Sequence, residues 1–318
     1  MNKIPEQTQT NNYLTEIPSA PPGYKSGFVA IVGRPNVGKS TLMNQMVGQK
    51  IAITSPIAQT TRNRLRGILT ATQGQIIFVD TPGIHKPQHE LGKILVKNAQ
   101  NAIAAVDLVL LVLDSSILAG GGDRYIVKLL EKSQTPVIVG LNKADLQGNN
   151  ATALDQSYQE LLSGKSWKIT KFSALTGEGL PQLQQIIIDH LPPGPYYYPP
   201  DLVTDQPERF IIAELIREQI LLHTRQEVPH SVAIAVEQIE ETPQITKIFA
   251  AINVERKSQK GIIIGKKGSM LKKIGASARE QIQKLISGEV YLKLFVKVEP
   301  KWRQSPVQLA EFGYRLEE

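Results

Sequence analysis

The chain has 318 residues, which at about 150 residues per domain suggests two domains. Its 36 Lys and Arg residues outnumber its 29 Asp and Glu residues, and the net charge of +7 hints at an anionic partner. The absence of cysteine excludes disulfides, iron–sulfur clusters, Cys-ligated zinc and a thiol nucleophile, and it suits a reducing, intracellular compartment. The hydrophobic fraction of 41% is ample for packed cores and excludes wholesale disorder.

The amino-terminal residues 1–26 are polar and proline-rich, and they lack the continuous apolar stretch of a signal peptide. We therefore expect a disordered leader there. The longest apolar run, residues 102–113, is too short to span a bilayer and is interrupted by Asp107. These patterns predict a soluble, cytoplasmic protein.

Residues 27–191 alternate short β-rich runs with segments of helical periodicity. Strands are predicted at Phe28–Val32, Gln75–Val79, Leu108–Leu113, Val137–Leu141 and Trp167–Phe172. Helices are predicted at Thr41–Val47, Leu91–Ala105, Gly122–Lys132, Ala153–Leu162 and Leu180–His190. Such alternation predicts an α/β domain with right-handed crossovers and a mainly parallel sheet covered by helices on both faces.

A stiff connector is predicted at residues 192–204, where prolines and three tyrosines gather. The tyrosines indicate that this linker packs against a domain. Residues 205–318 then form a smaller α+β domain with a C-terminal helix. Its predicted elements are a helix at Glu208–His223, strands at Ser231–Glu240, Gln244–Lys257 and Val290–Val298, and two helical pieces that flank Gly265–Gly268.

A phosphate-binding loop is predicted at Gly33-Arg-Pro-Asn-Val-Gly-Lys-Ser40, which matches the pattern GxxxxGK[ST]. The motif follows a predicted strand and opens a predicted helix, a context in which backbone N–H groups cradle phosphate oxygens. Lys39 is expected to reach the β- and γ-phosphates, and the Ser40 hydroxyl is expected to ligate Mg²⁺. The nucleotide-binding residues predicted here are Gly33, Arg34, Pro35, Asn36, Val37, Gly38, Lys39, Ser40 and Thr41.

Two further segments are predicted to serve the γ-phosphate and the metal. Asp80-Thr81-Pro82-Gly83 ends a buried strand, so Asp80 can hold Mg²⁺ through water, and the Gly83 N–H can approach the γ-phosphate closely. In the motif Gln59-Thr-Thr-Arg62, Thr61 is expected to complete the Mg²⁺ shell, with Thr60 as the alternative. The predicted catalytic residues are Lys39, Thr61 and Gly83, and the predicted metal ligands are Ser40, Thr61 and Asp80.

The base is predicted to be guanine. Asn142-Lys143-Ala144-Asp145 follows a strand, and the Asp145 carboxylate can accept hydrogen bonds from guanine N1–H and N2–H₂, whereas adenine would leave it unpaired. Asn142 is expected to support the loop, and the Lys143 stem is expected to lie along the base. Ser173, Ala174 and Leu175 end the next strand and supply a backbone N–H for guanine O6.

The segment Ile262–Ile274 resembles the KH signature, in which a GxxG turn joins two helices and clamps about four nucleotides of single-stranded RNA. Its glycines permit close approach of phosphates and its lysines supply charge. Ile263, Ile264 and Ile274 are expected to form the apolar floor of the groove. Between Arg256 and Arg279 there are eight Lys or Arg residues and no Asp or Glu, a footprint typical of phosphate contacts. The predicted RNA-binding residues are Ile263, Ile264, Gly265, Lys266, Lys267, Gly268, Lys272 and Lys273.

The order GRPNVGKST, QTTR, DTPG, NKAD and SAL is similar to that of the translation-associated GTPases. Combined with a type II KH arrangement, it resembles the Era family of ribosome-assembly GTPases from Gly27 to the C-terminus. The resemblance implies a P-loop GTPase that uses Mg²⁺ and hydrolyses GTP to GDP. It also implies binding of the 3′ region of small-subunit (16S-type) ribosomal RNA, and a role as a nucleotide-gated factor in 30S subunit assembly.

Two residues bear on the hydrolysis rate. Ile84 follows the DTPG motif where Ras-like enzymes carry a water-orienting glutamine, so slow intrinsic turnover is expected. Asn36 matches the asparagine that contributes to the cation site of related potassium-activated GTPases, and we hypothesise a K⁺ ion beside it. Two alternative functions remain: a non-catalytic RNA-binding regulator with GTP as a conformational ligand, and a signalling GTPase whose basic stripe contacts the inner face of the plasma membrane.

Overall fold

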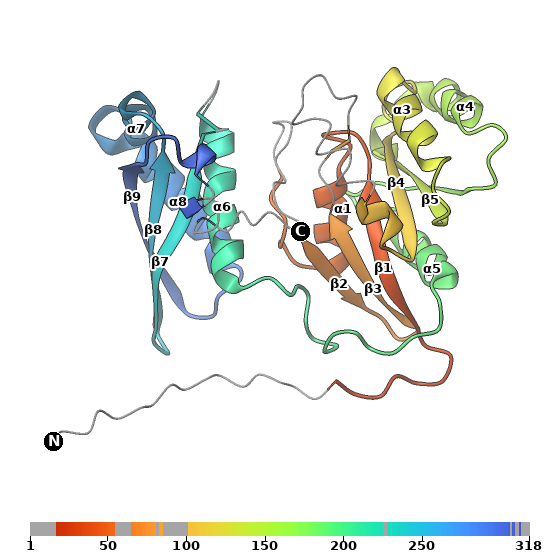
Figure 1. Ribbon diagram of the computed structural model, residues 1–318, viewed down its shortest axis with the longest axis horizontal. Coiled ribbons are helices and arrows are strands. Elements are labelled where there is room, and N and C mark those ends of the chain that lie inside the picture. The colour runs from red at the N-terminus through yellow and green to blue at the C-terminus, as the bar shows by residue number, and fades with distance from the viewer. Residues whose placement is uncertain are drawn as a thin grey trace.

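The computed structural model describes residues 17–54, 65–80, 83–84, 101–224, 228–229, 231–305, 307–308 and 312. Within these ranges the chain folds into an amino-terminal α/β domain with a six-stranded sheet and a smaller α+β domain with a three-stranded sheet (Figure 1). A connecting segment runs from the end of the first domain to the first helix of the second. Among the described residues, no helix combines the length and the apolar character that crossing a bilayer requires.

The first sheet has the strand order β2-β3-β1-β4-β5-β6. Neighbouring strands pair in parallel except β2, which is antiparallel to β3, so the predicted mainly parallel sheet is confirmed. The strands are β1 (Lys25–Val32), β2 (Arg66–Thr70), β3 (Gly74–Asp80), β4 (Leu108–Asp114), β5 (Val137–Asn142) and β6 (Lys168–Lys171). Strands β3, β4 and β5 are buried along their whole length, as continuous apolar strands between two helical layers must be.

Helices cover both faces of this sheet. Successive residues of β1 point to opposite faces, so Val29 and Ile31 share a core with α1 and α5, whereas Ala30 and Val32 share another with α3 and α4. Two hydrophobic cores therefore hold the sheet that carries the predicted nucleotide motifs. The helices are α1 (Lys39–Val47), α3 (Gly121–Leu130), α4 (Ala151–Leu161) and α5 (Leu180–His190).

The amino-terminal boundary differs from the sequence prediction. Strand β1 begins at Lys25, Tyr24 is only 3% exposed, and the Ser26 N–H donates to the Pro192 carbonyl. The last residues of the predicted disordered leader are therefore part of the folded domain. Their ordering depends on a partner segment far along the chain, which local composition does not reveal.

The linker packs against the first domain, as the tyrosines indicated. The Gln75 side chain on β3 accepts hydrogen bonds from the N–H groups of Tyr197 (2.8 Å) and Tyr198 (3.1 Å). The same amide donates to the Tyr198 carbonyl at 2.9 Å. Further along, the Ile68 N–H of β2 donates to the Val203 carbonyl. This segment is thus a fixed strap along the edge of the first domain, which carries the chain to α6.

The second domain stacks helices on one face of the sheet β7-β8-β9, in which β7 pairs antiparallel and β9 parallel to β8. Helix α6 buries many of its residues, including Ile212 and Ile216. The predicted C-terminal helix is described only in part, as a short 3₁₀ turn at Trp302–Gln304 and helical residues 307–308. The elements are α6 (Glu208–His223), β7 (Ala233–Glu241), β8 (Ile245–Val254), α7 (Lys257–Ile264), α8 (Ser269–Gln283) and β9 (Glu289–Val298).

Candidate nucleotide site and RNA interface

The predicted nucleotide motifs follow the carboxyl ends of adjacent parallel strands. The phosphate-binding loop follows β1, Asp80 ends β3, Asn142 ends β5, and Ser173 follows β6. These strands run parallel to one another, and each is either a direct neighbour of the next or separated from it by a single strand. Their carboxyl ends therefore meet at one edge of the sheet, where open α/β folds bind ligands. The structure therefore brings together segments that are far apart in sequence.

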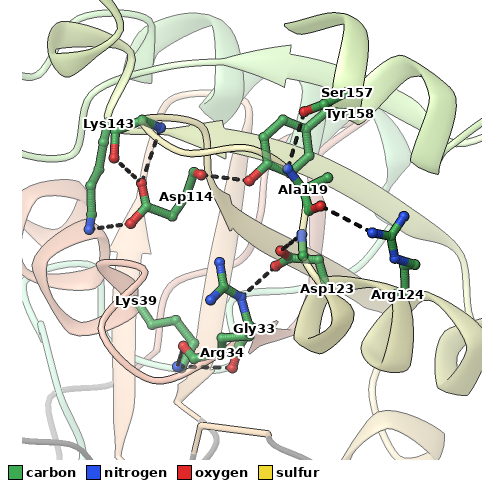
Figure 2. A network of polar contacts seen from close by, with 12 residues as sticks. Gly33, Arg34, Lys39, Asp114, Ala119, Asp123, Arg124, Lys143, Ser157 and Tyr158 are labelled. Atoms are coloured by element: carbon green, nitrogen blue, oxygen red, sulfur yellow. Dashed lines mark hydrogen bonds and ion pairs between the residues drawn. The ribbon is translucent and has the colours of Figure 1, made fainter. Parts of the chain in front are cut away.

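Lys39 is a buried cation inside the phosphate-binding loop. Its ammonium group donates to the carbonyls of Gly33 (3.2 Å) and Arg34 (2.9 Å), shown in Figure 2. Burial lowers the pKa of Lys39 to about 8, although the charge of Asp80 opposes the shift. A cation poised in this way gains both charge stabilisation and strong hydrogen bonds when phosphate oxygens replace the carbonyls. The geometry fits a group that binds the β- and γ-phosphates.

Ser40 and Asp80 form an oxygen-rich pair at the start of α1. The Ser40 hydroxyl donates to Asp80 Oδ2 at 3.4 Å, and Asp80 has no exposed surface. A hydroxyl and a carboxylate are the hard oxygen ligands that Mg²⁺ favours, so these residues fit the predicted metal. Thr61, the third predicted ligand, and its alternative Thr60 lie outside the described residues.

Gly83 lies directly against the phosphate-binding loop. A Cβ atom at this position would approach the Pro35 backbone nitrogen to 2.9 Å, so a larger residue would push the two segments apart. The next residue donates its N–H to the Gly33 carbonyl at 3.1 Å, which fixes the segment beside the loop. Thr81 and Pro82, also predicted to bind nucleotide, lie outside the described residues.

Asn142 connects three loops around the predicted base site. Its side-chain amide donates to the Val37 carbonyl at 2.7 Å, and its oxygen accepts from the Ala174 N–H at 2.8 Å. Gly38 has a positive φ of 98°, and a Cβ there would lie 2.4 Å from Asn142 Nδ2, so glycine is required. The predicted supporting role of Asn142 now has a geometric basis, since it ties the phosphate loop to the base-binding loops.

The remaining predicted base-site residues differ in their exposure to solvent. Asp145 and Leu175 are exposed, the latter by 75%, whereas Ser173 is fully buried. Lys143 adopts a left-handed backbone conformation and pairs with Asp114 at 2.5 Å. Burial raises the pKa of Asp114, but hydrogen bonds from Lys143 and the nearby serine outweigh it and hold the pKa below its ordinary value. The loop thus presents the Asp145 carboxylate toward solvent, where a base can reach it.

Two buried carboxylates at this site were not identified from the sequence. Asp123, in the first turn of α3, accepts from Arg34 Nε at 2.6 Å and from the Gly120 N–H at 2.9 Å (Figure 2). Gly122 leaves room for Arg34, since a Cβ there would lie 2.5 Å from Arg34 Cδ. Asp114, the other one, anchors Lys143. Two sequence features could have indicated these carboxylates. Asp114 is an acidic residue at the end of an apolar strand, and Asp123 follows a run of three glycines at the start of α3.

Two residues were expected to affect hydrolysis. Ile84 is 2% exposed and packs in the core shared with α3 and α4, so its side chain is turned away from solvent. Asn36 is exposed and has a φ of 64°, an uncommon conformation for a residue other than glycine.

Thr41, the last residue predicted for the phosphate-binding loop, is half-buried in the first turn of α1.

The GxxG segment projects from the second domain between α7 and α8. Lys266 and Lys267 are exposed, and both glycines adopt positive φ angles. A Cβ on Gly265 would lie 2.7 Å from the Met270 Cβ, whereas space beside Gly268 is open within 4 Å. The loop therefore exposes backbone and lysine charge on the same short segment, an arrangement that allows close approach of phosphates.

The apolar floor predicted from the sequence needs a correction. Ile263 and Ile274 have no exposed surface and belong to the domain core, so they lie behind the surface and not on it. The helical turn of α7 instead leaves Ile262 46% exposed and Ile264 half-buried. In a run of consecutive apolar residues the sequence does not indicate which side chains the helix buries. For this reason Ile263 was wrongly predicted to line the RNA groove.

The basic stripe of the second domain, the eight Lys and Arg residues between Arg256 and Arg279, is open to solvent. Lys272 and Lys273 are exposed on α8, and of the eight residues only Lys260 is half-buried. Across the part of the chain that the structure describes, none of the eight forms an ion pair with a carboxylate. The stripe therefore offers uncompensated positive charge to an anionic polymer.

Comparison with known proteins gives matches for both domains. A family model described as "50S ribosome-binding GTPase" matches residues 28–143, and one described as "KH domain" matches residues 227–303. The "GTPase Era" of Rippkaea orientalis is 72% identical over 304 residues, which cover 96% of this chain and 97% of the relative. The "GTPase Era" of Synechocystis sp. is 69% identical over 316 residues, 99% of each chain.

Solved structures give the same result. The chain is similar to Era in complex with MgGDPNP and nucleotides 1506–1542 of 16S ribosomal RNA, with a TM-score of 0.84 and 39% identity over 92% of this chain and all of the other. It is equally similar to a variant of Aquifex aeolicus Era bound to GDP·AlF₄⁻, with a TM-score of 0.84, 40% identity and the same coverage. With relatives 69% to 72% identical over nearly its full length, the chain belongs to the Era family of GTPases.

Proposed function

We propose that this GTPase binds the 3′ region of 16S-type ribosomal RNA through its KH domain and acts as a nucleotide-gated factor in cytoplasmic assembly of the 30S subunit. The observation that carries the proposal is the exposed GxxG loop, with Lys266 and Lys267 beside an open Gly268. A structural relative that is 39% identical is bound to nucleotides 1506–1542 of 16S ribosomal RNA, which supports the identity of the ligand.

The chemistry is attack of water on the γ-phosphate, promoted by positioning and charge stabilisation. Lys39 neutralises charge that develops on the phosphates, and the fixed loop holds them in place. Ser40 and Asp80 would hold Mg²⁺, which supplies further positive charge to the β- and γ-phosphate oxygens. The buried Ile84 side chain cannot orient the attacking water, so intrinsic turnover is slow.

A bound K⁺ ion beside Asn36 would add positive charge close to the phosphates. The exposed, left-handed Asn36 lies at the outer rim of the phosphate loop, a position compatible with this role. Turnover should then be several-fold faster in potassium than in sodium at equal ionic strength, and the difference should vanish in Asn36→Ala. Equal rates of the unaltered protein in the two salts would rule the ion out.

The substitution Gly268→Asp tests the RNA site. Space beside Gly268 is open, so the added carboxylate meets no neighbouring side chain and repels phosphates, and RNA affinity should fall at least about tenfold. The matched control is Gly164→Asp, at a glycine of the first domain with a similar positive φ and open surroundings. Binding of a labelled oligonucleotide that covers nucleotides 1506–1542 is the measurement. Unchanged affinity in Gly268→Asp would contradict the proposal.

The alternative of contact with the inner face of the plasma membrane is tested with the same proteins. Vesicles that contain anionic lipid require only positive charge, whereas the RNA groove also requires the close approach that glycine permits. We expect the unaltered chain to bind the oligonucleotide more tightly than vesicles at physiological salt. Equal loss of vesicle binding and RNA binding in Gly268→Asp would point to a shared surface.

A further inference from the structure

A buried carboxylate joins the two domains. Glu218 lies on α6 of the second domain and is 1% exposed. Its Oε2 pairs with Lys50 of the first domain at 2.5 Å, and its Oε1 accepts from the Thr54 N–H at 2.7 Å and from the Thr54 hydroxyl at 3.3 Å. Within its own domain the carboxylate accepts from Gln219 at 3.4 Å. Most of what satisfies this buried charge therefore comes from the other domain.

The segment between the two first-domain partners of Glu218 is hydrogen-bonded to the helix that begins at the phosphate loop. Asn44, on α1, accepts from the N–H groups of Ile51 (3.0 Å) and Ala52 (2.8 Å) and donates to the Ala52 carbonyl at 2.7 Å. Helix α1 starts at Lys39, which belongs to the phosphate loop. In sequence, Thr54 shortly precedes the Gln59–Arg62 motif with the predicted magnesium ligand.

On the other side, the contact reaches the helix that follows the GxxG loop. Lys50 donates to Gln281 of α8 at 3.5 Å, and α8 begins at Ser269, directly after Gly268. Lys50, Thr54, Glu218 and Gln281 line an interdomain pocket of about 530 Å³. A set of contacts thus runs from the phosphate loop through α1 and the segment that Asn44 holds to Lys50, which contacts both Glu218 of α6 and Gln281 of α8.

We propose that Glu218 is a positioning residue that couples the two sites, so that the affinity of the KH domain for RNA depends on the nucleotide bound by the GTPase domain. This inference rests on the proposed function and names the contact that performs the gating. A buried carboxylate that loses its partners without replacement is strongly destabilised. Any nucleotide state that displaces Lys50 or Thr54 must therefore move α6, and with it the second domain.

The coupling is reciprocal by thermodynamic necessity. If GDP and GDPNP give different RNA affinities, saturating RNA must change the ratio of GDP and GDPNP affinities by the same factor. Coupling between sites is commonly about 5- to 150-fold. We therefore expect the RNA dissociation constants of the two nucleotide states to differ by about fivefold or more, and this ratio is the readout specific to a coupling role.

The test measures that ratio in four full-length proteins: the unaltered chain, Glu218→Gln, Lys50→Gln and Glu280→Gln. Glu218→Gln keeps the shape of the side chain but loses the charge that pairs with Lys50, and Lys50→Gln breaks the same contact from the more exposed first-domain side. Glu280→Gln is the matched control, since it removes an exposed carboxylate of α8 that borders the same pocket. The probe is the labelled oligonucleotide of nucleotides 1506–1542, with GDP or GDPNP at saturation.

The expected result is a ratio below about twofold in Glu218→Gln and Lys50→Gln, with the ratio of the unaltered chain retained in Glu280→Gln. If both variants keep the original ratio, or if Glu280→Gln loses it equally, the coupling role of Glu218 is overturned. Equal RNA affinity in the two nucleotide states of the unaltered chain also overturns it, but leaves RNA binding intact. No RNA binding by the unaltered chain in either state overturns the proposed function as well.

Discussion

The two sites of this molecule are built on opposite principles. In the nucleotide site Lys39, Asp80 and Asn142 are almost completely buried and are held by loops from several strands. In the RNA site Lys266 and Lys267 stand in solvent on a short exposed loop. A compact ligand with dense charge benefits from a rigid, preformed cage, whereas a flexible polymer is held by many separate charges. Removal of a single polar or charged side chain should therefore have a large effect at the first site and a small, additive effect at the second.

The largest effect is expected for Asp145→Asn. The NH₂ group of the new amide would face the N2–H₂ group of guanine, so two donors would meet. Xanthine carries a carbonyl at this position, which can accept a hydrogen bond from the amide. Asp145 is exposed, and a bound base would cover it. Sites that select by hydrogen bonds buried with the ligand discriminate by about 10⁴-fold, so the preference for GTP over xanthosine triphosphate should collapse or invert. Competition of the two triphosphates against a fluorescent GDP analogue measures the preference.

The control for this specificity change is Asp201→Asn, at an exposed position of the linker. It removes the same charge from the chain and should keep the preference for GTP. A variant Asp145→Asn that still selects GTP as strongly as the unaltered protein would remove Asp145 from the base site.

A smaller but still large effect is expected for Asn142→Ala. The change leaves the Val37 carbonyl and the Ala174 N–H without their hydrogen-bond partner inside a buried site, at about 1–3 kcal/mol each. Loss of the connection between the loops should lower GDP affinity about 10²-fold, as measured by fluorescence titration. Asn150→Ala, at an exposed position before α4, is the matched control and should bind GDP normally. Near-normal GDP binding by Asn142→Ala would mean that the loops are preformed without it.

The sequence could predict those features that depend on a local residue pattern. The phosphate loop, DTPG and NKAD each combine a residue pattern with a strand end, and the structure places their described residues at one edge of the sheet. Hydrophobic period and turn residues were enough to find these elements. Strand β2 was missed because its five residues, Arg66–Thr70, carry glycine and little alternation, and it is ordered by pairing with β3.

Other features depend on contacts between distant residues, which no local pattern contains. Asp123 caps its own helix, yet its role beside Arg34 arises from the approach of α3 to the phosphate loop. From the sequence alone, Glu218 resembles an ordinary surface charge of an amphipathic helix. In the structure it contacts residues of the first domain. Ile263 was placed on the RNA surface because the run Ile262–Ile264 does not reveal which side faces inward. Tertiary packing settles each of these cases.

At the RNA site, the double substitution Lys266→Ala/Lys267→Ala should have a moderate effect. Removing two phosphate contacts should weaken RNA binding about tenfold at moderate salt and reduce the slope of log affinity against log salt by about 1.4. The matched control is Lys128→Ala/Lys132→Ala, two exposed lysines of the first domain. An unchanged salt slope would place the RNA phosphates elsewhere on the molecule.

The smallest expected effect is a pH dependence that only the buried site should show. Lys39 has a pKa of about 8 because burial disfavours its charged form, whereas its ordinary value is 10.5. Bound phosphates favour the charged form and raise this pKa, so above about pH 8 binding must take up a proton. Affinity should therefore fall as pH rises, by about threefold between pH 7.5 and 8.5, and level off below pH 7.

Calorimetric titration of GDP in buffers with different ionisation enthalpies measures the proton uptake directly. Lys39→Arg is the informative control, because a guanidinium stays charged throughout this range and should flatten the pH profile even if it binds GDP more weakly. The RNA site offers an internal contrast, since Lys39 takes no part in it, and RNA affinity at fixed salt should stay constant between the two pH values. No proton uptake near pH 8.5 would show that Lys39 is already charged in the free protein, in spite of its burial. A GDP affinity of the unaltered chain that rises with pH would mean that binding releases a proton, and it would contradict the prediction outright.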